Sequence, residues 1–201
     1  MRARQFGVAE AVRRVVVHQS HRLHVRINDR RADEAEPVRR QELDLASLCR
    51  DAVATLAPEA VRRRHQLACA LPPDALRVVG DPELLGVALR NLVENALRYT
   101  PEGGQITVSA GQEQGETFVS VRDSGPGVAA DELDQLTERF YRGRDVRAEG
   151  SGLGMALVQR ICELHGAILG LRNMPAAADG HGDPAGFLAC IHWPAAPAAR
   201  G

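Results

Sequence analysis

Hydrophobic residues recur at helical spacing in three long segments of the chain. In residues 82–98 apolar side chains repeat every three or four positions, and Asp81 followed by Pro82 supplies an N-cap and a first-turn proline. This helix is expected to end at residue 98, before the turn-forming cluster at 100–104. A second helix is predicted at 153–165, stopped by a glycine. A third is predicted from 42 to 64, where Pro58 either bends or restarts it.

Alternation of apolar and polar residues predicts strands between these helices. The expected strands cover residues 66–71, 76–79, 105–110, 117–123, 167–173 and 186–193. Two of them, 105–110 and 117–123, are typical of a hairpin. A short helix is expected at 130–139, followed by a loop of low apolar content at 141–150. Helices lie between strands without strict alternation, which predicts an α+β fold: a two-layer α/β sandwich whose mixed sheet carries helices on one face.

The N-terminal part of the chain differs in composition from the rest. Residues 1–36 hold eight Arg and five acidic residues, a net charge of +3, and their apolar periodicity is poor. We therefore expect a short helical remnant or linker in residues 1–37, one folded domain in residues 38–195 and a frayed tail in residues 196–201. No run approaches the roughly 20 apolar residues that span a bilayer, so no membrane contact by this chain itself is expected.

Composition narrows the possible chemistry. All 25 basic residues are Arg, which excludes a P-loop, the usual protein-kinase lysine and lysine Schiff-base catalysis. The net charge of −1 over 201 residues gives no general attraction to nucleic acid. The four cysteines lack zinc-ligand spacing and are interpreted as small buried hydrophobic residues in a reducing compartment: Cys49, Cys69, Cys162 and Cys190.

One face of the predicted helix at 82–98 carries polar side chains beside its apolar face. At 100° per residue, Asn91, Asn95, Arg98 and Tyr99 share this stripe. Amide oxygens are ligands for metal ions, and amide and guanidinium N–H groups donate to phosphate oxygens. The alternative is an ordinary solvated helix face.

Asp123 ends an apolar strand face and is followed by a glycine-rich turn. Alternation places its carboxylate on the same face as Val119 and Val121, where it needs hydrogen-bond donors. Gly125 and Gly127 let the backbone approach a ligand closely. The alternative is an aspartate that only caps the turn.

A second glycine-rich segment leads into the predicted helix at 153–165. Gly150, Gly152 and Gly154 precede or open that helix, whose free N–H groups form an anion site. The preceding loop carries Arg142 and Arg144 and suits a lid that orders over phosphates. The alternatives are a flexible glycine loop and a disordered surface loop.

The order and spacing of these motifs are more specific than any one of them. Residues 91–101, 123–127, 138–142 and 150–154 together resemble, in order, the four motif boxes of the ATP-binding catalytic domain of bacterial sensor histidine kinases. The resemblance covers roughly residues 38–195. It implies the ATP-binding sandwich that this family shares with gyrase, a heat-shock chaperone and mismatch-repair ATPases.

The resemblance implies a role for each motif residue, with ATP and Mg²⁺ as cofactors. Asp123 would accept from the adenine amino group, Tyr99 would lie against the adenine, and Gly125 and Gly127 would admit the base. Asn91 and Asn95 would hold the metal, and Arg98 would contact phosphates. Backbone N–H groups of the last motif would bind phosphates, a segment that comprises Gly150, Gly152, Leu153 and Gly154. One of three arginines would touch the γ-phosphate: Arg139, Arg142 or Arg144.

The resemblance also bears on the reaction. Gyrase-like members have a water-activating Glu where this chain has Asn91, and Glu94 is less well placed. Without such a base, phosphoryl transfer to a side chain is favoured over hydrolysis, with catalysis by positioning and by charge neutralisation.

The phosphoacceptor motif of a complete kinase is the main departure from the family. The family's acceptor is a histidine on a dimerisation hairpin, followed by an acid; here His21 is followed by Arg22, and too few residues separate it from the folded domain. His21 is thus a weak candidate acceptor, with His18 and His24 weaker. The expected partners are ATP, a histidine-containing dimerisation hairpin on another chain or segment, and a response regulator. The expected location is the cytoplasm. A homodimer and an inner-membrane anchor in the parent kinase stay open.

Two other functions fit the same residues. A non-catalytic nucleotide-sensing module would explain the missing acceptor motif. A serine kinase of the anti-sigma-factor type shares the scaffold and would need no acceptor histidine.

Overall fold

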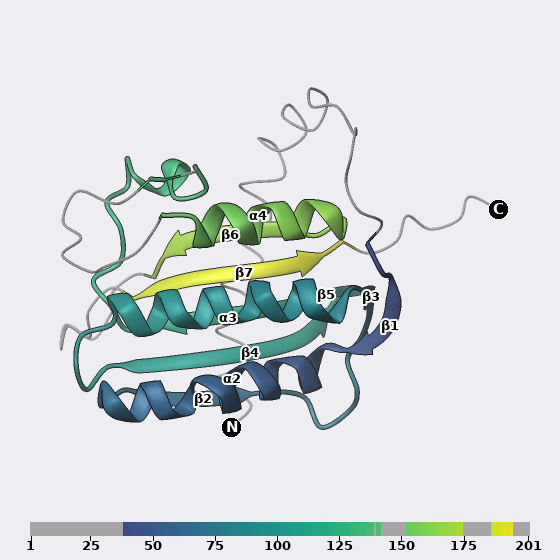
Figure 1. The fold of residues 1–201 in the computed structure, drawn as a ribbon, viewed down its shortest axis with the longest axis horizontal. Coiled ribbons are helices and arrows are strands. Elements are labelled where there is room, and N and C mark those ends of the chain that lie inside the picture. Colours follow the sequence, from purple (N-terminus) through teal and green to yellow (C-terminus); the bar gives the residue numbers. More distant parts are fainter. Residues whose placement is uncertain (1–37, 139, 142–151, 175–185, 195–201) are drawn as a thin grey trace.

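A five-stranded sheet with three helices on one face forms the body of the protein, seen in a computed structural model (Figure 1). The structure describes residues 38–138, 140–141, 152–174 and 186–194. The strand order is β2-β4-β5-β7-β6, in which β2 runs parallel to β4 and the other neighbours are antiparallel. These strands are β2 (Gln66–Ala70), β4 (Gln105–Glu113), β5 (Glu116–Asp123), β6 (Ile168–Asn173) and β7 (Phe187–Trp193).

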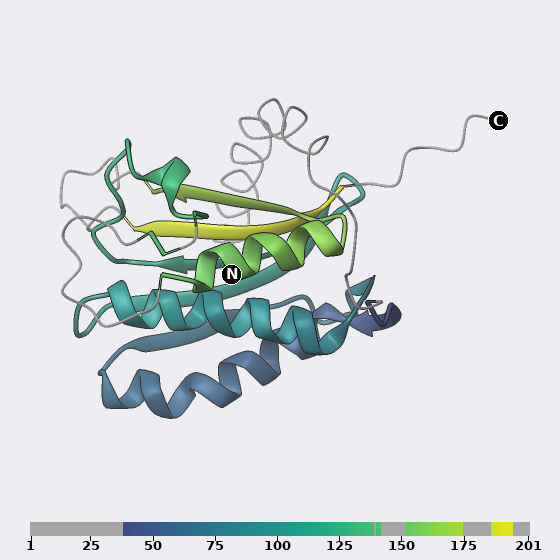
Figure 2. The same cartoon turned by 45° about the horizontal axis from the view of Figure 1, so that its top comes forward.

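The three helices pack side by side on the sheet: α2 (Leu45–Arg62), α3 (Pro82–Tyr99) and α4 (Gly154–Leu164). Both views place them on the same face, with α3 between the other two (Figures 1 and 2). A separate two-stranded sheet joins β1 (Gln41–Asp44) to β3 (Arg77–Gly80). The mixed sheet with helices on one face confirms the predicted fold class.

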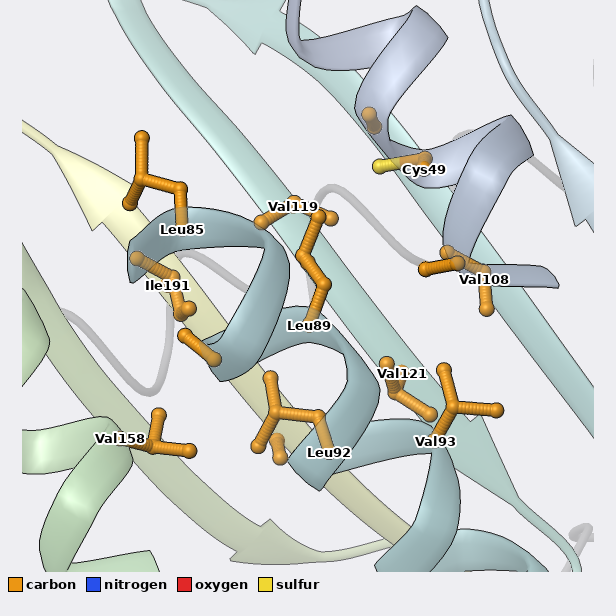
Figure 3. Close-up of a cluster of buried hydrophobic side chains, with 14 of the residues drawn as sticks. Cys49, Leu85, Leu89, Leu92, Val93, Val108, Val119, Val121, Val158 and Ile191 are labelled. Atoms are coloured by element: carbon orange, nitrogen blue, oxygen red, sulfur yellow. The ribbon is translucent and has the colours of Figure 1, made fainter. Parts of the chain in front are cut away.

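The core lies between α3 and the central strands. Leu85, Leu89, Leu92 and Val93 project from α3 toward Val119, Val121 and Ile191 of the sheet, with Val158 of α4 and Cys49 of α2 at the flanks (Figure 3). Each α3 side chain in this group is at most 2% exposed. Truncating such a leucine to alanine typically costs about 2–5 kcal/mol, so this one apolar stripe holds α3 firmly on the sheet.

Aspartate caps set the starts of α2 and α3. Asp81 accepts hydrogen bonds from the N–H groups of Glu83 and Leu84, and Pro82 occupies the first turn as predicted. Asp44 accepts from the N–H groups of Ala46 and Leu76 and so also ties α2 to the segment before β3. Pro58 lies inside α2, which continues through it to Arg62.

Two sequence predictions about elements were wrong. The helix predicted from residue 42 begins at Leu45, because residues 41–44 pair with β3 as a strand and Asp44 then caps the helix. The helix predicted at 130–139 is reduced to the 3-10 turn Leu133–Gln135. That segment has only Leu133 and Leu136 as apolar anchors among acidic and polar residues, too few to hold a helix against the body.

Several other predictions concern single residues or chain ends. Three of the cysteines are buried as predicted, but Cys69 is exposed because β2 is an edge strand with no neighbour on its other side in the described sheet. Within the described ranges, no helix is long and apolar enough to cross a membrane. The predicted segments 1–37 and 196–201 lie outside the described residues, and the domain limits stay a prediction.

Candidate functional site

The last motif of the sequence lies directly against the first. Gly154, the first residue of α4, sits so close to α3 that a Cβ on it would lie 2.9 Å from Oδ1 of Asn91 and 3.7 Å from Nδ2 of Asn95. Asn91 is oriented by a 2.9 Å hydrogen bond from its Nδ2 to the carbonyl of Val87. Its Oδ1 is thereby turned toward the start of α4, and Asn91 and Asn95 lie half-buried beside Gly154.

The start of α4 presents backbone N–H groups next to these amides. Its N-cap is Leu153, whose side chain offers no acceptor, so it makes no capping bond. The first N–H groups of an α-helix have no partner within the helix and lie at the positive end of its dipole. An anionic group placed beside Asn91 and Gly154 would therefore meet both N–H donors and a favourable field.

The second part of the candidate site is Asp123, at the end of β5. It ends β5 with its carboxyl group on the helix-covered face, 7% exposed, as alternation predicted. Its Oδ1 accepts a 2.7 Å hydrogen bond from the N–H of Gly125. Burial raises the pKa of the carboxyl group above its ordinary value, while hydrogen bonds from Gly125 and Phe187 oppose that shift. The result is a buried acceptor at the edge of the core.

Gly125 brings the turn after β5 against the end of α3. A Cβ on Gly125 would lie 2.8 Å from Oδ1 of Asp123 and 3.1 Å from the carbonyl oxygen of Tyr99. Any larger residue would push the turn away from both. Gly127 has a positive φ of 73°, which a residue with a side chain rarely adopts. The path of the turn therefore requires both glycines, and the close approach of a ligand to them stays a prediction.

The segment before α4 is fixed by an unusual contact between two residues. Phe140 donates its N–H to the carbonyl of Gly152 over 3.1 Å, and both have positive φ, 65° and 69°. A Cβ on Gly152 would lie 2.8 Å from the backbone of both Phe140 and Tyr141. This contact brings the third and fourth motifs together. The Phe140 side chain is left 72% exposed.

The remaining predicted site residues divide into those that the structure describes and those that it does not. Arg98 is half-buried, and Tyr99 is 44% exposed at the end of α3, close to the turn that holds Gly125. Five of the predicted residues lie outside the described ranges: His21, Arg139, Arg142, Arg144 and Gly150. The weaker acceptor candidates His18 and His24 lie there too.

A metal ion at this site would depend on amide oxygens. Within the described ranges, no group of three or more His, Cys, Asp or Glu residues is arranged to hold a metal. Mg²⁺ in nucleotide sites commonly takes one or two protein oxygens and completes its shell with phosphates and water. The Oδ1 of Asn91, directed toward the start of α4, fits such a role.

The sequence analysis did not predict the pairings of two polar residues that hold elements of the site in place. Asn173, at the end of β6, pairs with the backbone of Val128 just after the Asp123 turn. His165, just after α4, joins the end of that helix to the start of α3. Neither belongs to a recognisable motif, and their partners are 45 and 84 residues away. Only the folded chain reveals these pairings.

Comparison with known proteins decides the family. Residues 80–195 match the family of histidine kinase-, DNA gyrase B- and HSP90-like ATPases. The chain belongs to this family. It is 34% identical over 152 residues to the sensor protein QseC of Escherichia coli, covering 76% of this chain and 31% of QseC.

Solved structures of family members confirm the fold. The mycobacterial sensor histidine kinase MprB superimposes with a TM-score of 0.63 at 28% identity, covering 78% of this chain and 98% of the MprB chain. Full-length ShkA in complex with AMPPNP gives a TM-score of 0.67 at 27% identity, covering 82% of this chain and 33% of ShkA. This chain thus carries an ATPase domain of the sensor-histidine-kinase kind, and it spans less than a third of QseC.

Proposed function

We propose that this domain binds Mg-ATP between α3, the turn after β5 and the start of α4, and transfers the γ-phosphoryl group to a histidine. The observation that carries the proposal is that Gly154 packs against Asn91 and Asn95 of α3, while the turn after the buried acceptor Asp123 packs against the end of the same helix. One end of the proposed site would then hold the carboxylate that recognises the base, and the other end would hold the phosphates and the metal. The AMPPNP bound in the ShkA structure, an ATP analogue, supports ATP as the ligand.

In this proposal, the adenine would lie at Asp123, Gly125 and Tyr99. The Asp123 carboxylate would accept from the exocyclic amino group of the base. Phosphates would lie at the start of α4, where Gly152, Leu153 and Gly154 offer backbone N–H groups. Asn91 and Asn95 would hold Mg²⁺ through their amide oxygens, and the metal would neutralise phosphate charge.

The transfer step needs little covalent chemistry from the protein. A histidine nitrogen would attack the γ-phosphorus in line with the bond to the bridging oxygen, ADP would leave with that bond's electrons, and the imidazole would lose its N–H proton. The phosphoryl group would then pass to a response-regulator aspartate. The acceptor histidine is proposed to lie on a dimerisation hairpin of the parent kinase, and ATP as donor implies the cytoplasmic side of the cell.

The position of Glu94 supports transfer over hydrolysis. Its side chain is exposed, whereas Asn91 and Asn95 on the same helix are half-buried and lie against Gly154. A water-activating base must be within hydrogen-bond reach of the attacking water. Glu94 is turned away from the proposed phosphate position, so ATP hydrolysis should be slow.

The test uses the chain with γ-labelled Mg-ATP, alone and with a kinase-inactive relative that carries the acceptor histidine. We expect calorimetric ATP binding, little phosphate release, and label on the relative that resists base but not acid. Glu94→Gln should leave these results unchanged. Failure to bind ATP would overturn the proposal.

Three other outcomes would each replace it with a different function. Label that resists acid but not base would indicate a serine kinase. ATP binding without any transfer would indicate a nucleotide-sensing module. Rapid phosphate release that Glu94→Gln abolishes would indicate a hydrolase.

A further inference from the structure

One side chain at the end of β6 holds both backbone polar groups of a residue in the loop after Asp123. Oδ1 of Asn173 accepts from the N–H of Val128 over 2.8 Å, and Nδ2 of Asn173 donates to the carbonyl of Val128 over 2.5 Å. Both residues are half-buried. Asn173 is the last residue of β6, and its planar amide pairs with Val128 as the backbone of a neighbouring strand would.

The Asn173–Val128 pair is the last of several hydrogen bonds that hold residues 123–128 in place. The turn starts with Asp123, which accepts from Gly125 over 2.7 Å. Ser124 then makes two hydrogen bonds with the backbone of Gln105, one through its N–H and one through its Oγ. Only the stretch around Gly127 lies between these bonds and Val128. The turn is therefore fixed at both of its ends.

Beyond Val128 the described chain forms short-range backbone hydrogen bonds and the 3-10 turn Leu133–Gln135. Asn173 instead joins Val128 to a strand 45 residues away, at the end of the turn that carries Gly125 and Gly127. Loss of the amide would release this end of the turn.

We propose that Asn173 is a positioning residue for nucleotide binding: by holding Val128 it keeps the turn at 123–128 ordered before the base arrives. The inference rests on the function proposed above. Asn173 itself touches no substrate; it acts through Val128 on the turn. A turn that is already ordered binds a ligand more tightly, because the ordering entropy does not have to be paid on binding.

The chemistry of the pair defines how substitutions should rank. Asn173→Ala leaves both polar groups of Val128 without their partner. Asn173→Asp offers two acceptors, so a carboxylate oxygen faces the Val128 carbonyl and one hydrogen bond becomes a repulsion. Asn173→Gln keeps a donor and an acceptor on a side chain one methylene longer, so it should rescue part of the effect.

The experiment measures Mg-ATP affinity by calorimetry for the wild-type chain and these three variants, with Ile168→Val as the control. Ile168 lies at the other end of β6, and its truncation loosens the same edge strand without touching Val128. We expect Asn173→Ala to weaken ATP binding roughly tenfold, the effect of losing about one hydrogen bond. Asn173→Asp should be weaker still, and Asn173→Gln intermediate.

A second readout separates positioning from a general loss of stability. Hydrogen exchange at the N–H groups of Gly125, Gly127 and Val128 should accelerate in nucleotide-free Asn173→Ala and should slow to the wild-type level at saturating ATP. The Ile168→Val control should change neither exchange at these residues nor ATP affinity. With an acceptor present, Asn173→Ala should raise KM for ATP and leave kcat unchanged.

The outcomes distinguish the two proposals. If the wild-type chain binds no ATP, the proposed function fails. If the wild-type chain binds ATP and Asn173→Ala binds it equally well, only the role of Asn173 is overturned. Weaker binding by both Asn173→Ala and Ile168→Val to the same degree would also overturn it, because the effect would then be a loss of strand stability.

Discussion

The ring of His165 joins the end of α4 to the start of α3. Its Nε2 accepts a 2.9 Å hydrogen bond from the N–H of Asp81, and its Nδ1 lies 2.7 Å from the carbonyl of Ile161. Both bonds form at once only when the proton is on Nδ1 and the ring is neutral. Asp81 is also the N-cap of α3, so one buried ring holds together the two helices that frame the candidate site.

Replacing this ring should destabilise the fold. His165→Phe keeps a flat aromatic ring, somewhat larger than imidazole, but leaves the Asp81 N–H and the Ile161 carbonyl without their partner. We expect the free energy of unfolding to fall by about 1–3 kcal/mol, measured by urea denaturation. Arg40→Ala, which removes only an exposed contact with the carbonyl of Leu164 in the same region, serves as the control and should cost much less. Equal losses in the two variants would contradict a special role for the ring.

Gly154 should tolerate no side chain if the site binds phosphates. In Gly154→Ala the new methyl group would press on Oδ1 of Asn91, whose amide is held by Val87 and cannot simply swing away. We expect Mg-ATP affinity to fall at least tenfold, measured by calorimetry, at a cost in stability of about 1–3 kcal/mol. Gly86→Ala in α3 is the control: its methyl group would meet the flexible end of Arg90 at 3.3 Å and Cδ1 of Leu48 at 3.8 Å, an ordinary contact distance. Wild-type affinity in Gly154→Ala would remove the start of α4 from the proposed site.

Asn91 is expected to act through a metal ion. Asn91→Ala should reduce the affinity for ATP in the presence of Mg²⁺ more than the affinity measured in EDTA, because only the first depends on the amide oxygen as a ligand. Titrations of the variant and the wild type under both conditions measure this difference. An equal loss with and without Mg²⁺ would mean that Asn91 contacts the nucleotide itself or only shapes the site.

The carboxylate of Asp123 should increase the affinity for ATP and lower the stability of the fold. Asp123→Asn can still accept from Gly125, but its amide nitrogen cannot accept from an adenine amino group, so ATP affinity should fall about 10- to 100-fold. Because burial raises the pKa of this carboxyl group, its charged form is disfavoured in the fold at neutral pH. The melting temperature of Asp123→Asn should therefore equal or exceed that of the wild type at pH 7.

The same pKa shift predicts how that advantage depends on pH. As the pH falls through the raised pKa of Asp123, the wild-type carboxyl group becomes neutral in the fold, and the advantage of Asp123→Asn should disappear. Melting curves from pH 7 to pH 4 measure this. Asp51→Asn, which alters an exposed carboxylate of α2, should change neither ATP affinity nor melting. A strong destabilisation by Asp123→Asn at pH 7 would show that the carboxylate is mainly structural.

The sequence could predict what depends on short-range pattern and not what depends on contacts between distant residues. Asp123 was placed on the core face because strand alternation has a period of two, and the cap at Asp81 followed from its two neighbours. Strand β1 was missed because four residues before a helix carry no pattern that separates them from it; pairing with β3 decides their structure. Asn173 and His165 act through partners far along the chain, which no local spacing encodes.

The fold should lose stability at acidic pH because His192 is buried. This residue of β7 is only 3% exposed, and its sheet neighbours in register are Phe118 and Ile168. Its Nε2 lies 3.3 Å from a carboxylate oxygen of Glu116, without hydrogen-bond geometry. Burial lowers the pKa of the ring below its ordinary value of 6.5, and the nearby carboxylate offsets only part of that shift.

A lowered histidine pKa makes stability fall toward acid. Well above pH 6.5 the ring is neutral in both the folded and the unfolded chain, so it has no effect on the pH dependence. Below that value the unfolded chain takes up a proton that the fold resists, and stability should fall by up to about 1.4 kcal/mol per pH unit until the folded ring is protonated. His192→Gln removes this proton uptake, so its unfolding free energy should depend less on pH between 7 and 5. Identical pH profiles for His192→Gln and the wild type, measured by urea denaturation, would show that Glu116 compensates burial fully.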